Sequence, residues 1–219
     1  MPLIRADLHI HTVYSDDSNA SLERIIARCL EVGINCIAIT DHNTIAGALE
    51  MKRIAPFQVI VGDEIHTSAG EIIGYFLAEE IPKGLAAEET ARLIKEQGGL
   101  VGIPHPFDRL RRSTIHRQTL EELLPYIDII EVLNSRLLLR RQSIMAERFA
   151  QAHGLLASAG SDAHRPGEIG NAYVEMPEFN DRDQFLSALA QGRVTGRGAA
   201  LWAPLWSTWV KLERALKRR

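Results

Sequence analysis

Short apolar runs alternate along the chain with segments in which apolar residues recur every three or four positions. The first apolar run is LIRADLHI, and Leu22, Ile25 and Cys29 then mark one face of a helix expected over 21–32. Further strands are expected at NCIAIT, FQVIVG, EIIGYFLA, LVGIP, DIIEVL and LLASAG, and further helices at 45–53, 87–97, 120–124, 137–153 and 183–191. Because nearly continuous apolar strands alternate with helices, the pattern predicts an α/β fold with a mainly parallel sheet.

Histidines and carboxylates gather where these apolar runs end. The clusters are DLHIHT with a following SDD (7–17), TDH (40–42), GDE (62–64), PHP (104–106) and SDAH (161–164). A closed barrel collects its functional groups at the carboxyl ends of its strands, whereas an open doubly wound sheet collects them at one crevice. Groups contributed by the first strand through the last are easier to bring together around a ring, so we expect a barrel.

The spacing within the clusters points to metal binding. His9 and His11 are two positions apart, and residues i and i+2 of a strand point to the same side. The same spacing relates Asp162 to His164, and it relates Glu64 to His66. Histidine and carboxylate together suit Zn, Mn or Fe. A single histidine in a strand is more often structural, so the prediction of a multinuclear metal site rests on all the clusters together.

Length and composition are those of an ordinary enzyme domain. A chain of 219 residues is long enough for one well-buried core, and a net charge of -3 gives no overall reason to expect nucleic-acid or membrane affinity. Cys29 and Cys36 are too few for a disulfide framework and are expected to be reduced core residues. The start MPLIRADLHI lacks an apolar leader pattern, and no apolar run approaches the roughly 18 residues of a membrane span. We therefore expect a cytoplasmic protein.

The order DLHIHTxxSD, TDH, GDE, PHP and SDAH resembles the PHP (polymerase and histidinol phosphatase) family of metal-dependent phosphoesterases. The resemblance covers residues 3 to about 198. It implies a distorted (β/α)7 TIM-like barrel over 1–198, two or three divalent ions (Zn, Mn or Fe) and hydrolysis of phosphoesters. Single pieces such as HxH are shared by many metalloenzymes, whereas all the clusters in this order are specific.

Carried over position by position, the family pattern makes His9 and His11 ligands of one ion that Asp162 completes, with Glu64 as a bridge between ions. The ligand set implied in this way is His9, His11, Asp16, His42, Glu64, His105, Asp162 and His164.

Two departures from the family pattern leave alternatives open. Many members carry SDG where this chain has SDD, so whether Asp16 or Asp17 is the ligand is not fixed. Members with three ions often supply a histidine where this chain has Glu131 and Asn134, and either Glu131 or His66 is an alternative ligand. For His66 a substrate-facing or polar loop residue is favoured over a ligand.

Two further residues near the clusters are expected to act indirectly. Asp41 is interpreted as a residue that orients His42 or its loop, and Asn43 as a helix N-cap.

Phosphoester hydrolysis by neighbouring ions implies attack by metal-bound hydroxide. Asp162 or His164 is then the expected proton-transfer residue. Arg136 and Arg165 follow two of the strand ends and are expected to bind the phosphate of the substrate. Arginines at 109, 111 and 112 are equally consistent with a phosphate contact and with a solvated loop. The five lysines fall in helices, loops or the tail, which disfavours the carboxylated lysine of many amidohydrolases.

The expected substrate is a small phosphorylated molecule such as a nucleotide, or a nucleic-acid end. The residues between Glu64 and His105 leave no room for an insertion domain, which favours an open mouth. An amidohydrolase-like metallohydrolase and a non-catalytic PHP module that binds metal or a partner are the alternatives.

The last residues, 199–219, form a basic segment that contains Trp202, Trp206 and Trp209. A basic amphipathic helix is expected there. Packing on the barrel is favoured over contact with a membrane surface.

Overall fold

The computed structural model of the chain describes residues 3–196, so the predicted helix at 199–219 and its boundary with the barrel lie outside the described residues. Within 3–196, one sheet runs in the order β7-β6-β5-β4-β3-β2-β1-β8-β9. The strands are β1 (Leu3–Ile10), β2 (Cys36–Ile39), β3 (Gln58–Thr67), β4 (Gly70–Tyr75), β5 (Leu100–Ile103), β6 (Ile127–Asn134), β7 (Leu156–Gly160), β8 (Ala172–Pro177) and β9 (Arg193–Gly196). The helices are α1 (Leu22–Val32), α2 (Ala46–Ile54), α3 (Ala87–Glu96), α4 (Arg117–Glu122), α5 (Arg140–His153) and α6 (Arg182–Ala190), with a 3-10 turn η1 (Pro166–Glu168).

Six of the strands form two parallel sets. β1, β2 and β3 pair in parallel, and so do β5, β6 and β7, while β4 lies antiparallel between β3 and β5. The predicted mainly parallel α/β barrel is confirmed. The apolar runs of the sequence predicted β1 to β7 and did not predict β8 and β9. These two strands pair antiparallel with each other, and β8 also pairs with the first half of β1.

The barrel is nearly closed at the carboxyl end of its strands. A parallel bridge joins Ile10 to Ala163, and the backbone N–H of Asp162 donates to the carbonyl of His9 at 2.7 Å. Gly160 permits this approach, because a Cβ on it would lie 2.3 Å from Cβ of His9. The end of β7 therefore meets the end of β1 at the place where the polar clusters collect.

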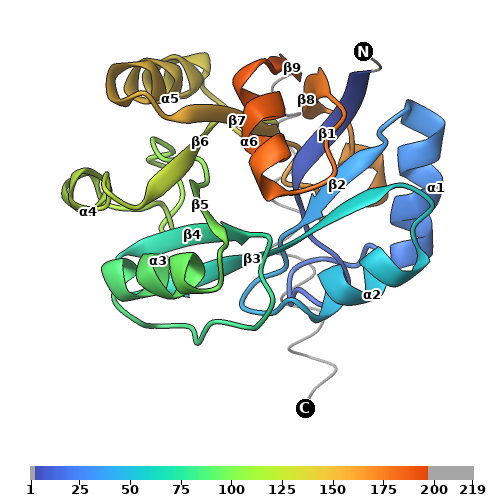
Figure 1. Cartoon of the computed structure of the whole chain (residues 1–219), viewed down its shortest axis with the longest axis horizontal. Coiled ribbons are helices and arrows are strands. Elements are labelled where there is room, and N and C mark those ends of the chain that lie inside the picture. Colours follow the sequence, from blue (N-terminus) through green and yellow to red (C-terminus); the bar gives the residue numbers. More distant parts are fainter. Residues whose placement is uncertain (1–2, 197–219) are drawn as a thin grey trace.

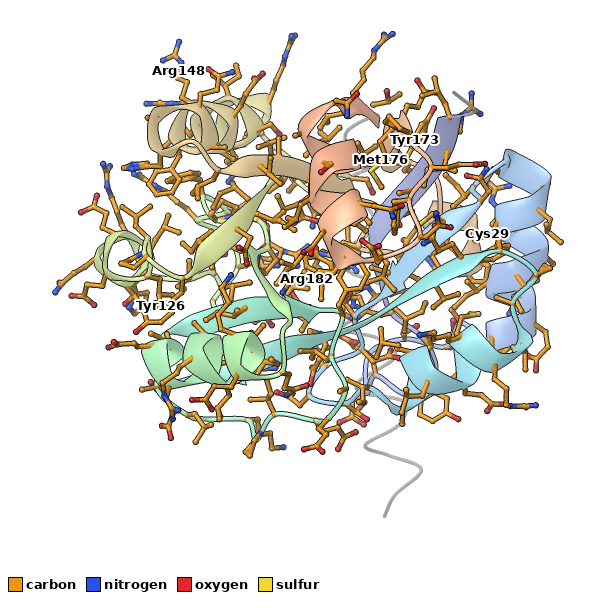
Figure 2. The ribbon with its side chains drawn as sticks, viewed as in Figure 1. Cys29, Tyr126, Arg148, Tyr173, Met176 and Arg182 are labelled. Atoms are coloured by element: carbon orange, nitrogen blue, oxygen red, sulfur yellow. The ribbon has the colours of Figure 1, made fainter. Side chains whose placement is uncertain are left out.

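Figure 1 shows α1 and α2 on one side of the molecule, α3, α4 and α5 on the other, and α6 between them. Side chains fill the space between these layers, among them Cys29 of α1, which is labelled in Figure 2. One apolar cluster lies between helices and sheet and includes Ile25, Met51 and Ile94. A second cluster includes Leu8 and Tyr75 from the strands together with Phe185 of α6. This second cluster buries the interior of the barrel beneath the polar end.

Most predicted helices agree with the structure. Gly33 ends α1 in the left-handed conformation at φ 73°, as expected of a glycine stop. The helix expected at 120–124 is α4, which begins three residues earlier at Arg117. Both cysteines are buried and free, as predicted. Within the described part of the chain, no helix has the length and apolarity needed to cross a bilayer.

Candidate metal centre

Histidine and carboxylate side chains from six strands or strand ends converge at the nearly closed end of the barrel. Four overlapping groups within residues 3–196 have candidate ligand atoms within 4.8 Å of one another. They are His11, Asp17, His42 and His164; His9, His11 and Glu64; Glu64, Glu71 and His105; and His42, His66 and Glu71.

Glu64 lies at the centre of this arrangement. Its Oε2 atom is 3.3 Å from Nε2 of His9, Nε2 of His11 and Nδ1 of His42. Its Oε1 atom is 3.2 Å from Nε2 of His105. Burial alone would raise the pKa of Glu64, but His9 and His42 outweigh burial and hold this pKa well below its usual range. An ionised carboxylate between two sets of imidazoles is the geometry of a ligand that bridges two cations.

Asp17, and not Asp16, enters the histidine cluster, which corrects the choice of Asp16 as a ligand. Asp17 is buried, and its Oδ2 atom is 3.4 Å from Nε2 of His42 and 3.2 Å from Nε2 of His164. Asp16 is exposed and belongs to none of the four groups. Adjacent residues of a bent loop point in different directions, so sequence spacing does not decide between them.

Asp41 holds the loop that carries Asp17. Its Oδ1 atom accepts from the Thr12 backbone N–H at 2.6 Å and from the Ser15 hydroxyl at 2.8 Å, and its Oδ2 atom accepts from the Thr12 hydroxyl at 2.7 Å. Ser15 Oγ in turn accepts from the backbone N–H of His42 at 3.0 Å. Asp41 therefore holds the loop that carries Asp17, and Ser15 connects this loop to the backbone of His42.

Asp162 is fixed from several sides. It lies just after β7 with φ at 52°, a left-handed conformation that is rare for residues other than glycine. Its Oδ2 atom accepts from the guanidinium of Arg111 and, at 3.1 Å, from Nδ2 of Asn134. Burial would raise the pKa of Asp162, but Arg111 and His9 hold it well below the usual range. Its Oδ1 atom faces Nε2 of His11 at 3.4 Å.

Glu131 is a supporting residue and belongs to none of the four groups. Its Oε1 atom lies 3.0 Å from Nδ1 of His9, and its Oε2 atom accepts from the backbone N–H of His105 at 2.8 Å and from Nδ2 of Asn134 at 3.0 Å. A carboxylate on Nδ1 fixes the ring of His9 so that Nε2 faces Glu64 and Asp162. Glu131 and Asn134 thus orient the groups around them.

Glu71 is the functional candidate that sequence reasoning missed. It is buried on β4, and its Oε2 atom is 3.6 Å from Nε2 of His105. In the β3–β4 hairpin Glu71 pairs with His66, and His66 shares a strand face with Glu64. Numbering the residues outward from the two-residue turn at 68–69 gives this register, so the signal was present in the sequence.

His66 and Asn43 form a pair next to Glu71. Oδ1 of Asn43 accepts from the backbone N–H of His66 at 2.9 Å, and Nδ2 of Asn43 lies 3.0 Å from Nδ1 of His66. Nε2 of His66 lies 3.0 Å from Oε1 of Glu71. The N-cap position of α2 is Ile45, so the interpretation of Asn43 as a helix cap is wrong.

The arginines around the centre differ in their partners. Arg136 is buried, and its Nη1 atom is 2.5 Å from Nδ1 of His164. Arg165 pairs with Glu168 at 2.8 Å, and Glu168 also accepts from the backbone N–H of His164. Arg111, from the loop after the PHP motif, reaches Asp162. Arg111 and Arg136 therefore bring positive charge next to the carboxylate cluster.

The histidines of the centre lie in different electrostatic surroundings. Burial lowers the pKa of His164 to about 4, with His11 and Arg136 adding to the effect. Burial also lowers the pKa of His11, but Asp162 and Glu64 outweigh it and raise the value to about 9. At neutral pH His164 presents an unprotonated imidazole, the form in which histidine binds a metal ion.

The donor set fits divalent cations. Among the described residues, Oε2 of Glu64, Oε2 of Glu71 and Oδ1 of Asp162 are buried oxygens without a hydrogen-bond partner. Buried carboxylate oxygens are costly unless they are hydrogen-bonded or bound to a cation. These three face the imidazoles of the cluster, and imidazole with carboxylate is the ligand set of Zn, Mn and Fe sites.

Comparison with known proteins finds relatives of this chain. A family model described as PHP-associated matches residues 142–194. A protein of Methanocaldococcus jannaschii described only as uncharacterized is 36% identical over 180 residues, which cover 81% of this chain and 72% of that protein.

Two solved structures share the fold. A two-domain protein from Bacteroides vulgatus, described as containing a predicted PHP-like metal-dependent phosphoesterase, aligns with a TM-score of 0.72 at 19% identity, over 90% of this chain and 65% of that one. The lesion-specific endonuclease PfuEndoQ from Pyrococcus furiosus aligns with a TM-score of 0.67 at 19% identity, over 88% of this chain and 58% of that one. This chain spans less than two thirds of either structure. The sequence relationship, the family match and the shared barrel together show that the chain belongs to the PHP domain family.

Proposed function

We propose that the chain is a metal-dependent phosphoesterase that hydrolyses a small phosphorylated substrate. The observation that carries the proposal is the position of Glu64, whose two oxygens lie 3.2–3.3 Å from imidazoles contributed by three different strand ends. A single ion would need only one side of this carboxylate. Donors on both sides support a centre with more than one divalent ion.

The proposed ligands divide around Glu64. One position is formed by His9, His11 and Glu64, with Oδ1 of Asp162 3.4 Å from His11. A second, histidine-rich position is formed by Asp17, His42 and His164, with the ring of His11 next to them. His105 lies on the far side of Glu64. Divalent ions bound there would lower the pKa of a water molecule and neutralise the charge of a phosphoryl group.

The neighbouring arginines would orient the phosphate. Arg111 and Arg136 flank Asp162, and a guanidinium presents paired N–H donors that match phosphate oxygens. Arg165, also proposed as a substrate ligand, is held by Glu168 and would have to exchange this partner for a phosphate. The proton-transfer role of Asp162 or His164 stays a prediction, and their contacts with the other proposed ligands favour metal binding for both.

A cavity beside the centre supports an anionic substrate. It has a volume of about 420 Å³ and is lined by Pro106, which follows His105, and by Arg109, Arg111 and Arg112. Asp108 is the one carboxylate in this lining, and its side chain is occupied by Arg111 and by Gln142. The lining suits a nucleotide or a nucleic-acid end, and the name of the structurally similar Pyrococcus furiosus endonuclease is consistent with this substrate class.

Hydrolysis should be assayed on a panel of phosphomonoesters, cyclic nucleotides, nucleoside bisphosphates and short 5′-phosphorylated oligonucleotides. The protein should be stripped with a chelator and reloaded with Zn, Mn or Fe. We expect release of phosphate or nucleotide that needs added metal and that Glu64→Gln abolishes. Cleavage of amides or lactones without any phosphoester cleavage would favour an amidohydrolase-like enzyme. Full metal occupancy without hydrolysis of any substrate would favour a non-catalytic binding module.

A further inference from the structure

We propose that Glu71 is a metal ligand and that Glu64, Glu71 and His105 form a carboxylate-rich position that selects a harder ion than the histidine-rich position does. The harder ion would be Mn(II) or Mg(II), and the histidine-rich position would take Zn(II). This inference rests on the multinuclear centre of the proposed function and adds a ligand and a metal preference to it.

The first step is the orientation of Asn43. Its Oδ1 atom accepts from the backbone N–H of His66 at 2.9 Å, and a backbone N–H can only donate. The amide is therefore fixed with its NH2 group toward Nδ1 of His66, at 3.0 Å. Since that NH2 group donates, Nδ1 of His66 is an acceptor and carries no proton.

The second step follows from this tautomer. A neutral imidazole without a proton on Nδ1 carries it on Nε2, and Nε2 of His66 lies 3.0 Å from Oε1 of Glu71. His66 thus donates to Glu71, and its Nε2 lone pair is not available for a metal ion. Asn43 and His66 form a clamp that positions Oε1 of Glu71. His66 and Glu71 also belong to one of the four candidate groups, but in this tautomer His66 is a hydrogen-bond donor and not a ligand.

The third step concerns the other oxygen of Glu71. Oε2 is buried, is without a hydrogen-bond partner among the described residues, and lies 3.6 Å from Nε2 of His105. Nε2 of His105 is 3.2 Å from Oε1 of Glu64. Two carboxylate oxygens and one imidazole nitrogen therefore face a common point, and the clamp holds Glu71 toward that point.

The two positions differ in chemistry. The carboxylate-rich position offers two carboxylates and one imidazole, whereas the histidine-rich position offers the imidazoles of His42 and His164 and one carboxylate, with the ring of His11 next to them. Oxygen ligands suit Mg and Mn, and imidazole suits Zn. Because the Irving–Williams order favours Zn over Mn at any one site, a preference for Mn at one of two positions has to come from its donor set.

The test is a metal titration of the purified full chain after chelator treatment. Mn(II) binding is followed by the electron paramagnetic resonance signal of the free ion, first alone and then with one equivalent of Zn(II) already bound. For the wild type we expect Mn(II) to bind in the presence of that Zn(II). Glu71→Gln should weaken Mn(II) binding at least about tenfold and leave the first equivalent of Zn(II) bound as before. Glu71→His should let Zn(II) displace Mn(II).

Glu79→Gln, which changes an exposed carboxylate just after β4, is the matched control and should bind as the wild type does. His66→Ala should weaken Mn(II) binding by less than Glu71→Gln, because Glu71 remains. Circular dichroism of the metal-free variants checks that each is folded, and Glu71→His keeps the test decisive should Glu71→Gln not fold. Wild-type Mn(II) affinity in both Glu71 variants would overturn the inference and leave the proposed function intact. Failure of the wild type to bind any divalent ion would instead overturn the metal centre itself.

Discussion

Substitution of Gly160 by alanine tests whether the close approach of β7 to β1 builds the metal centre. A Cβ on Gly160 would lie 2.3 Å from Cβ of His9, 2.8 Å from the His9 backbone nitrogen and 3.0 Å from Oε1 of Glu131. Carbon atoms in contact lie about 3.5–4.0 Å apart, so the two strands would have to separate by roughly 1 Å or more. Two of the three atoms belong to backbone or to a Cβ and cannot rotate away.

The expected cost can be estimated from this overlap. Overpacking of a buried site typically destabilises a protein by about 1–3 kcal/mol. For domains of this size about 1 kcal/mol lowers Tm by roughly 2–4 °C, so Gly160→Ala should lower Tm by about 2–12 °C. His9 would move with its strand, and the hydrogen bond from Asp162 N–H to His9 would lengthen. We therefore expect weaker metal binding together with the lower stability.

Differential scanning calorimetry of the metal-free protein measures the first effect, and isothermal titration with Zn(II) measures the second. Gly167→Ala is the matched control, because a Cβ at Gly167 meets nothing within 4 Å. This control should melt and bind as the wild type does. If Gly160→Ala also matched the wild type in both measurements, the reasoning that a glycine is required for closure would be refuted.

Three other predictions concern the surroundings of the centre and the core. Asp41→Ala removes the acceptor of three hydrogen bonds from the Thr12–Ser15 loop. It should lower the free energy of unfolding, measured with urea, by about 3 kcal/mol. A change below about 0.5 kcal/mol would contradict the role of Asp41 in this loop. Burial raises the pKa of the Cys29 thiol to about 12 and raises the pKa of the Cys36 thiol as well. Neither thiol should therefore react with a thiol reagent until the protein unfolds. Rapid labelling of the native protein would contradict this prediction. Because the pKa of His11 is about 9 in the metal-free protein, metal binding at neutral pH should release protons and weaken as pH falls. Titration calorimetry in buffers of different ionisation enthalpy measures the release, and its absence would contradict the assignment of His11.

The six strands of the two parallel sets could be predicted because each is a short, largely apolar run, and β2 and β5 are buried throughout. The last two strands were missed for different reasons. β8 alternates buried Ala172, Val174 and Met176 with partly exposed residues, and this two-residue period is typical of a half-buried strand. β9 (Arg193–Gly196) is four residues long without a fully buried side chain, so its pattern resembles a loop.

The ligands at strand ends could be predicted because a strand fixes which side chains share a face. Asp16 and Asp17 lie in an irregular loop whose path depends on Asp41, some 24 positions later in the chain, so the correct carboxylate could not be chosen from spacing. Glu71 required the register of a hairpin. Arg111 required the path of a loop that returns to Asp162, which is a contact between distant parts of the chain.

Anomalous X-ray diffraction from crystals grown with Mn(II) and Zn(II) tests the central claim most directly. The account predicts separate ions on the two sides of Glu64, one bound through His9 or His11 and one through His105, at distances of about 2.0–2.2 Å. Ions found only away from Glu64, or a Glu64 carboxylate that binds none of them, would contradict it.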